Sequence, residues 1–241
     1  LNKVLVSVFL ILFSVFSWAN PLPQAKPEEV GMSSERLKKV KTYFDGEVAA
    51  GRLPGGVIAI ARQGKLVMYE SFGKHNPTSS SAMPKDAIFR IYSMTKPLAS
   101  VAAMVLIEDG VIQLTDPVSK WLPEFASMKV SIPIKGTDGK TTYEIIPAAR
   151  PILVQDLFRH TSGLAYGEIT QNEPVEQAYV VAGIYKPGKN EYDSRDMTPA
   201  EQVTGVAKAP LAHQPGMIWE YSFASDILGR VVESASKKSL G

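Results

Sequence analysis

The chain has 241 residues, of which 45% are hydrophobic and 21% charged, and its formal net charge is +2. This composition is ordinary for a globular enzyme, and the charge gives no reason to expect nucleic acid or an acidic membrane surface as a partner. The chain has no cysteine, which excludes thiol nucleophiles, disulfides and thiolate metal sites, and its three histidines lack the i, i+4 spacing of a helical metal site, so we expect neither a metal nor a cofactor.

The first residues have the pattern of a secretory signal. Lys3 precedes an apolar run over residues 4–16, which is followed by small residues suited to cleavage after Ala19. The run is shorter than the ~20 residues of a membrane-spanning helix. We therefore expect a signal peptide over residues 1–19, a Pro-rich linker over 20–29 and one domain over 30–241. The predicted location is the periplasm or the exterior, with a membrane contact only through an uncleaved signal.

The next elements suggest a helix and a hairpin. Ser33 or Ser34 can cap a helix with apolar residues at 37, 40, 43 and 44, which Gly51 ends. Residues 57–61 and 66–70 read as two strands joined by a turn.

Later segments alternate between helical and irregular patterns. Residues 98–108 are apolar on every side, which predicts a helix buried on all sides. Asp116 followed by Pro117 predicts the start of a short helix, with Asp116 as its N-cap. Residues 131–142 are interpreted as a loop or small hairpin, and helices are predicted over 154–158, 198–207 and 221–236. The stretch 168–197 has no clear period and is interpreted as an irregular insertion.

The most informative local feature is Ser93 followed three residues later by Lys96. A serine needs a base beside it to become a good nucleophile, and residues i and i+3 of a helix lie on one face. Pro97 is tolerated only where no intrahelical hydrogen bond is due, so it fixes this pair in the first helical turn. Free backbone N–H groups at that point can help to hold an oxyanion. The pattern alone is weak, because Ser93 could be only a helix cap and Lys96 only a solvated side chain.

Several longer stretches in the right order carry a family resemblance. They read RIYSMTKP at 90–97, EDG at 108–110, LTDPV at 114–118, LFRHTSGL at 157–164, QPGMIWEYS at 214–222 and DILGRVVE at 226–233. Together they resemble the serine β-lactamase superfamily, in particular the class C β-lactamases and the family VIII carboxylesterases. The resemblance implies an α+β fold of the β-lactamase/transpeptidase type, with an antiparallel sheet flanked by helices and an added helical region.

The resemblance also implies roles for three residues. Ser93 would be acylated, Lys96 would accept its proton, and Tyr221 would share that proton network and protonate the leaving group. The β-lactamase pattern has asparagine where this chain has Phe223, which favours the esterase branch. The third family motif, Lys-Thr-Gly or His-x-Gly on a strand, is expected beyond Gly241, so the chain reads as incomplete at its C-terminus.

We therefore expect a secreted serine hydrolase that cleaves small esters or amides through an acyl-enzyme; the sequence leaves its oligomeric state open. The alternatives are a true β-lactamase or D-amino-acid peptidase, and a non-catalytic penicillin-fold protein that binds peptidoglycan or a partner. His160 beside Ser162 invites a triad interpretation, but the chain has no G-x-S-x-G motif, and His160 is expected to be a structural hydrogen-bonding residue.

Overall fold

A computed structural model describes residues 21–78, 80–188 and 197–240. The chain divides into two compact units, with the boundary between Arg90 and Ile91. The predicted signal peptide over 1–19 lies outside the described residues. The expected linker over 20–29 runs into a short 3-10 helix, Pro27–Val30. Among the residues described, no helix is both long and apolar enough to cross a membrane.

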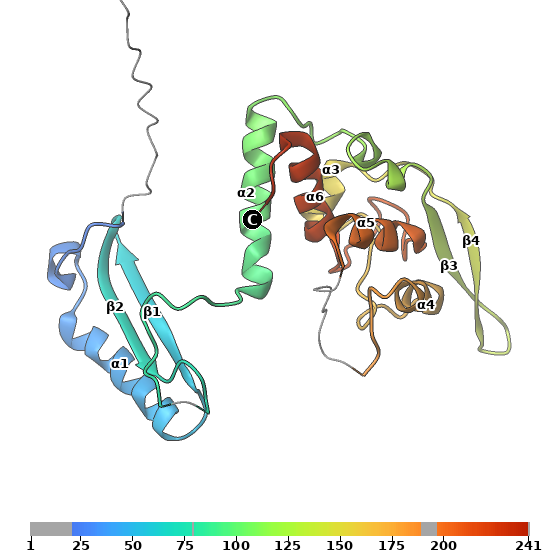
Figure 1. Cartoon of the computed structure of the whole chain (residues 1–241). Coiled ribbons are helices and arrows are strands. Elements are labelled where there is room, and N and C mark those ends of the chain that lie inside the picture. The colour runs from blue at the N-terminus through green and yellow to red at the C-terminus, as the bar shows by residue number, and fades with distance from the viewer. Residues whose placement is uncertain (1–20, 79, 189–196, 241) are drawn as a thin grey trace, which may run out of the picture. The chain divides into compact units, whose positions relative to one another are not determined.

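The first unit is a helix packed on a two-stranded hairpin (Figure 1). Helix α1, Ser34–Ala49, begins where the Ser33 side chain accepts a hydrogen bond from the backbone N–H of Arg36, as predicted. Strands β1, Gly55–Arg62, and β2, Lys65–Gly73, pair antiparallel. The turn between them has positive φ at both central residues, 51° and 71°, which suits the right-handed twist of a tight hairpin. The predicted helix and hairpin are both confirmed.

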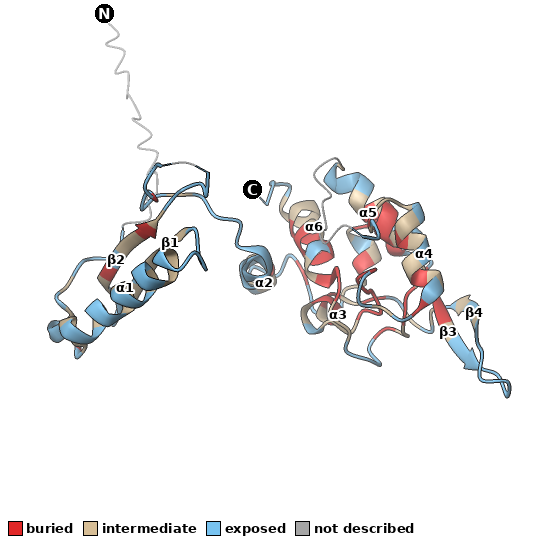
Figure 2. Cartoon of the chain, turned by 90° about the horizontal axis from the view of Figure 1, so that it is seen from below, coloured by how far each residue is buried: buried red, intermediate tan, exposed pale blue. Residues whose placement is uncertain are grey.

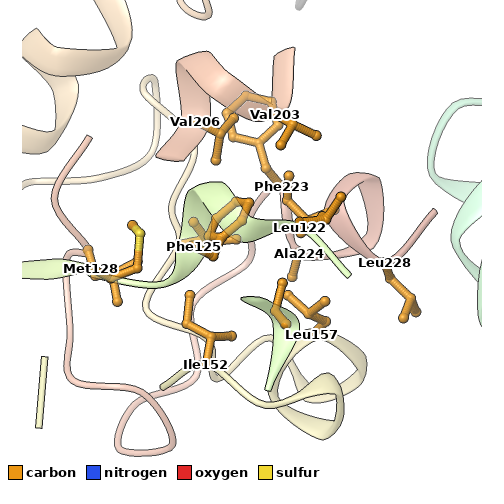
Figure 3. Close-up of a cluster of buried hydrophobic side chains, with 14 of the residues drawn as sticks. Leu122, Phe125, Met128, Ile152, Leu157, Val203, Val206, Phe223, Ala224 and Leu228 are labelled. Atoms are coloured by element: carbon orange, nitrogen blue, oxygen red, sulfur yellow. The ribbon is translucent and has the colours of Figure 1, made fainter. Parts of the chain in front are cut away.

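The second unit holds the larger core and most of the helices. Its elements are α2 (Thr95–Glu108), β3 (Lys129–Lys135), β4 (Thr141–Pro147), α3 (Val154–Arg159), α4 (Glu173–Val181), α5 (Pro199–Lys208) and α6 (Ala224–Ser236). β3 and β4 form a second antiparallel hairpin. The core gathers apolar side chains from α3, α5, α6 and the segment before β3, with Phe125 and Leu157 almost fully buried (Figure 3).

Three sequence-based expectations need correction. The stretch 168–197 is not irregular throughout, because Glu173–Val181 forms α4, a helix short enough to leave only a weak period. Asp116 does not cap a helix: Pro117 is extended and a 3-10 turn follows, while the Asp116 carboxylate accepts hydrogen bonds from Gln113 N and Lys120 Nζ. The last helix begins at Ala224 rather than at Tyr221.

The predicted burial of α2 is also wrong for this chain. Only Ala99 and Ala103 are buried, and they lie where α2 packs against α6. Leu98 and Val101 each keep 61% of their surface exposed, and α2 appears largely in the exposed colour in Figure 2. Apolar composition on every side predicted burial, but within this unit α6 covers only one side of the helix.

Candidate active site

Ser93 lies at the start of α2, in a backbone with unusual geometry. The 3-10 turn Tyr92–Met94 runs directly into the helix, and Tyr92 has a φ of 46°, in the left-handed region that non-glycine residues seldom adopt. Pro97 is the third helical residue, where its missing N–H costs no intrahelical hydrogen bond. The sequence-based placement in the first helical turn is therefore correct for Lys96, whereas Ser93 lies in the 3-10 turn that directly precedes α2. Ser93 is exposed to solvent.

Three polar side chains meet at this point. The Lys96 Nζ donates a hydrogen bond of 3.2 Å to the Ser93 Oγ, and the Ser93 Oγ lies 2.6 Å from the Tyr221 hydroxyl. The Lys96 Nζ is also 4.7 Å from the centre of the Tyr221 ring. All three residues named from the sequence are thus within hydrogen-bonding reach of one another. A hydroxyl so placed can pass its proton to the amine while it attacks a carbonyl, and the phenol lies where it can donate a proton of its own.

The electrostatics of Tyr221 suit proton transfer. Desolvation by itself raises the pKa of the phenol, but the hydrogen bonds to Lys96 and Ser93 and the positive charge of Lys96 outweigh it. The pKa of Tyr221 is therefore lowered from its ordinary value, so the phenolate forms at a lower pH than in a free tyrosine.

Two backbone hydrogen bonds between segments distant in the sequence hold Tyr221 in place. Glu220 N donates to His160 O at 2.9 Å, and Gly216 N donates to Thr161 O at 2.6 Å. The hydrogen bond from Gly216 requires glycine at this position for two reasons. The φ of Gly216 is 87°, in the left-handed region, and the Arg150 guanidinium lies where a Cβ atom would be. Arg150 is in turn held by two hydrogen bonds to the buried carboxylate of Asp156. The segments 160–163 and 213–221 are therefore fixed to each other, and the second one ends at Tyr221.

His160 has a structural role here, as expected from the sequence. Its ring centre lies 5.0 Å from that of Tyr221, and its Nδ1 is 3.4 Å from the Ser222 Oγ. Desolvation, and then the charge of Lys96, lower the pKa of His160, so the ring is neutral near pH 7. Ser162 is fully buried and its Oγ accepts from Leu164 N, so it is not presented to a substrate.

A pocket opens beside the three polar side chains. Its volume is about 450 Å³, and its lining includes Ser93, Lys96, Tyr166, Phe223 and Asp226. Phe223, which replaces the asparagine of the β-lactamase pattern, is buried and packs edge-on against Tyr166 at 4.5 Å. This position therefore supplies an apolar wall and no side-chain amide.

Sequence reasoning missed Tyr166 and Asp226 as site residues. Tyr166 follows the stretch 157–164 by two positions, and its ring lies edge-on to Tyr221 at 5.4 Å. Asp226 lies within the stretch 226–233, in the first turn of α6. Both occur in or beside segments already singled out, but only the packing of α6 against α2 brings Asp226 to the pocket that Ser93 lines.

Comparisons with known proteins identify relatives of this chain. A family model described as Beta-lactamase matches residues 40–241. The chain is 36% identical over 183 residues to Protein Rv1367c of Mycobacterium tuberculosis, a match covering 76% of this chain and 42% of that protein. It is 31% identical over 203 residues to esterase EstB of Burkholderia gladioli, covering 84% of this chain and 46% of EstB.

A solved structure is also similar. EstCE1, described as a hydrolase with promiscuous acyltransferase activity, superimposes with a TM-score of 0.66 at 30% identity, covering 85% of this chain and 48% of that one. The chain thus spans about half the length of the curated relatives it matches.

Proposed function

This chain belongs to the β-lactamase family and has its α+β, β-lactamase/transpeptidase-like fold, and on this premise we propose that it carries the nucleophile of a serine esterase. The observation that supports the proposal most directly is the meeting of Ser93, Lys96 and Tyr221 within hydrogen-bonding distance. A protein that only binds a partner has no need of this arrangement, which speaks against the non-catalytic alternative.

The proposed reaction has two steps. The Ser93 Oγ attacks the ester carbonyl while Lys96 takes its proton, and Tyr221 passes a proton to the leaving alkoxide as the carbon–oxygen bond of the ester breaks. The acyl group is then bonded to Ser93 and the alcohol leaves. Water attacks the acyl-enzyme, gives a proton back through the same side chains, and releases the carboxylic acid. The backbone N–H of Ser93, at the start of α2, is one candidate donor to the oxyanion.

Small esters are preferred over β-lactams in this proposal. Phe223 offers no amide to the acylamide chain of a β-lactam, and two of the similar proteins are named as an esterase and a hydrolase with acyltransferase activity. True β-lactamase or D-amino-acid peptidase activity remains the alternative. We further propose that the protein acts in the periplasm or outside the cell, which the signal-like pattern over residues 1–19 supports.

Labelling with a fluorophosphonate probe tests the nucleophile. Mass spectrometry of the labelled protein should locate the adduct on Ser93, and Ser93→Ala should abolish labelling and turnover without loss of folding. Ser162→Ala is the matched control and should keep both. An adduct on Ser162 or Ser222 would refute the assignment of the nucleophile.

Comparing kcat/KM for p-nitrophenyl butyrate and nitrocefin at one pH tests the substrate class. The ester should be the better substrate. A nitrocefin value higher by about tenfold, or 1.4 kcal/mol in transition-state binding, would favour the β-lactamase alternative.

A further inference from the structure

Asp226 places a carboxylate in the pocket beside Ser93, and no side chain in the described part of the chain pairs with that carboxylate. Arg230, one turn further along α6, pairs with Glu233 instead. Lys96 influences Asp226 through its charge but is not within ion-pair distance, and among the described residues Asp226 has no side-chain hydrogen bond or ion pair. The side chain is exposed towards the pocket while protein surrounds it on its other sides, and this desolvation raises the pKa of its carboxyl group.

The same pocket has aromatic walls. Tyr92, Tyr166 and Phe223 all line it, and Ala99 and Ile184 add aliphatic surface. Aromatic faces attract cations through their negative ring faces, and a carboxylate attracts them through its charge. A volume of about 450 Å³ lies within the range of about 300–1,000 Å³ typical of small-molecule sites.

We propose that this pocket selects esters that carry an ammonium group, with Asp226 opposite the positive charge and the aromatic rings around its methyl or methylene groups. The inference rests on the proposed esterase function and names the substrate class of the same site. The part of the ester that enters the pocket can be the acyl chain or the alcohol, and the chemistry of recognition is the same for both.

Arg230 and Lys96 also line the pocket, and their positive charges act against the binding of a cationic substrate. The groups next to each of them reduce this effect. The charge of Arg230 is offset by Glu233. The Lys96 Nζ is directed to the Ser93 Oγ, to which it donates a hydrogen bond, and it forms no ion pair with Asp226 in the described part of the chain. A substrate cation near Asp226 also favours the ionised carboxylate, in opposition to the effect of desolvation.

The alternative is that Asp226 only stabilises α6, and this alternative predicts a different result. Asp226 is the third residue of α6, where a negative charge stabilises a helix through its dipole by about 0.3–1 kcal/mol. That role needs no pocket, and Glu201 has the equivalent position at the start of α5 without lining the pocket. Glu201→Gln is therefore a matched control for removing a charge from the first turn of a helix.

The test uses isosteric ester pairs that differ only in charge. One pair is the p-nitrophenyl esters of 4-(trimethylammonio)butyric and 5,5-dimethylhexanoic acid, and the other is butyrylcholine and 3,3-dimethylbutyl butyrate. In at least one pair, Asp226→Asn should lower the cation-to-neutral ratio of kcat/KM by about tenfold or more, the size of one lost charged contact. Glu201→Gln should leave both ratios unchanged. Equal ratios in the wild type and Asp226→Asn, for both pairs, would overturn the inference.

A binding measurement separates this inference from the proposed function. In Ser93→Ala the same esters should bind without turnover, and calorimetry should show tighter binding of the cationic member, a preference that Asp226→Asn on the same background removes. A wild type that hydrolyses none of these esters while Ser93→Ala still prefers the cation would refute the esterase and keep the pocket assignment. Turnover of the neutral esters without any preference for the cation would support the esterase and refute the pocket assignment.

Discussion

The Ser93 Oγ and the Tyr221 hydroxyl lie 2.6 Å apart although 128 residues separate them in the chain. The contact joins the start of α2 to the segment that leads into α6, and the packing of these two helices maintains it. A substitution that removes only the hydroxyl oxygen of Tyr221 tests the role of this contact. Tyr221→Phe keeps the ring and its packing against His160 and Tyr166 but loses the proton carrier. We expect kcat/KM for esters to fall by about 10²–10⁴.

Thermal melting provides the control for Tyr221→Phe. The melting temperature should stay near that of the wild type, because the ring contacts remain. A variant with wild-type kcat/KM would remove Tyr221 from the mechanism, whatever its stability.

The pH dependence of acylation should respond to Asp226. The negative charge of Asp226 raises the pKa of Tyr221, in opposition to Lys96, so neutralising it in Asp226→Asn should lower that pKa further. Because Tyr221 donates a proton to the leaving alkoxide, activity falls as the pH rises through the pKa of Tyr221, and the alkaline limb of the kcat/KM profile should therefore move to lower pH. The profile of a neutral ester, measured in wild type and variant, reports the shift. A limb that moves to higher pH would contradict the sign.

The buried carboxylate of Asp156 should be important for stability. Desolvation raises its pKa, but hydrogen bonds from Arg150, Leu153 N and Thr161 and the charge of Arg150 outweigh this, so the pKa is lowered. Asp156→Asn breaks a buried pair, and we expect it to cost about 3 kcal/mol or more in the free energy of unfolding.

The pH dependence of that loss has a defined sign. Because the folded pKa of Asp156 lies below the unfolded value, its stabilisation is present above about pH 4 and is lost as the pH falls through the folded pKa. Denaturant unfolding at pH 7 and at about pH 3 should show the wild type and Asp156→Asn converging in acid. If the two proteins differ in free energy of unfolding by the same amount at both pH values, the charge of the Asp156 carboxylate is not the cause of the stabilisation.

Gly216 should tolerate no side chain. Gly216→Ala meets the Arg150 guanidinium and a φ of 87°, while Gly183→Ala has a φ of 72° with open space around it. The control should lose about 1–2 kcal/mol from the backbone alone. Gly216→Ala should lose more, and it should also reduce kcat because the displaced segment carries Tyr221. Equal losses of stability and full activity in both variants would show that the contact with Arg150 is unimportant.

The sequence by itself determined the local parts of this protein. The helix cap at Ser33, the hairpin turn at Gln63 and Gly64, and the spacing of Ser93 and Lys96 within one turn depend on neighbours within four residues, and the structure confirms each of them. The short helix α4 was missed because nine residues give too little period to recognise.

Tertiary structure alone decided which distant residues share the site and which apolar ones are covered. Tyr221 was named only through a family resemblance, and the positions of Tyr166 and Asp226 in the pocket were not foreseen at all. The exposure of Leu98 and Val101 could not be derived from their hydrophobicity, since burial depends on the partner that packs against a helix face. Contacts between residues more than a hundred positions apart depend on how helices pack, and a one-dimensional pattern of residue types does not contain that geometry.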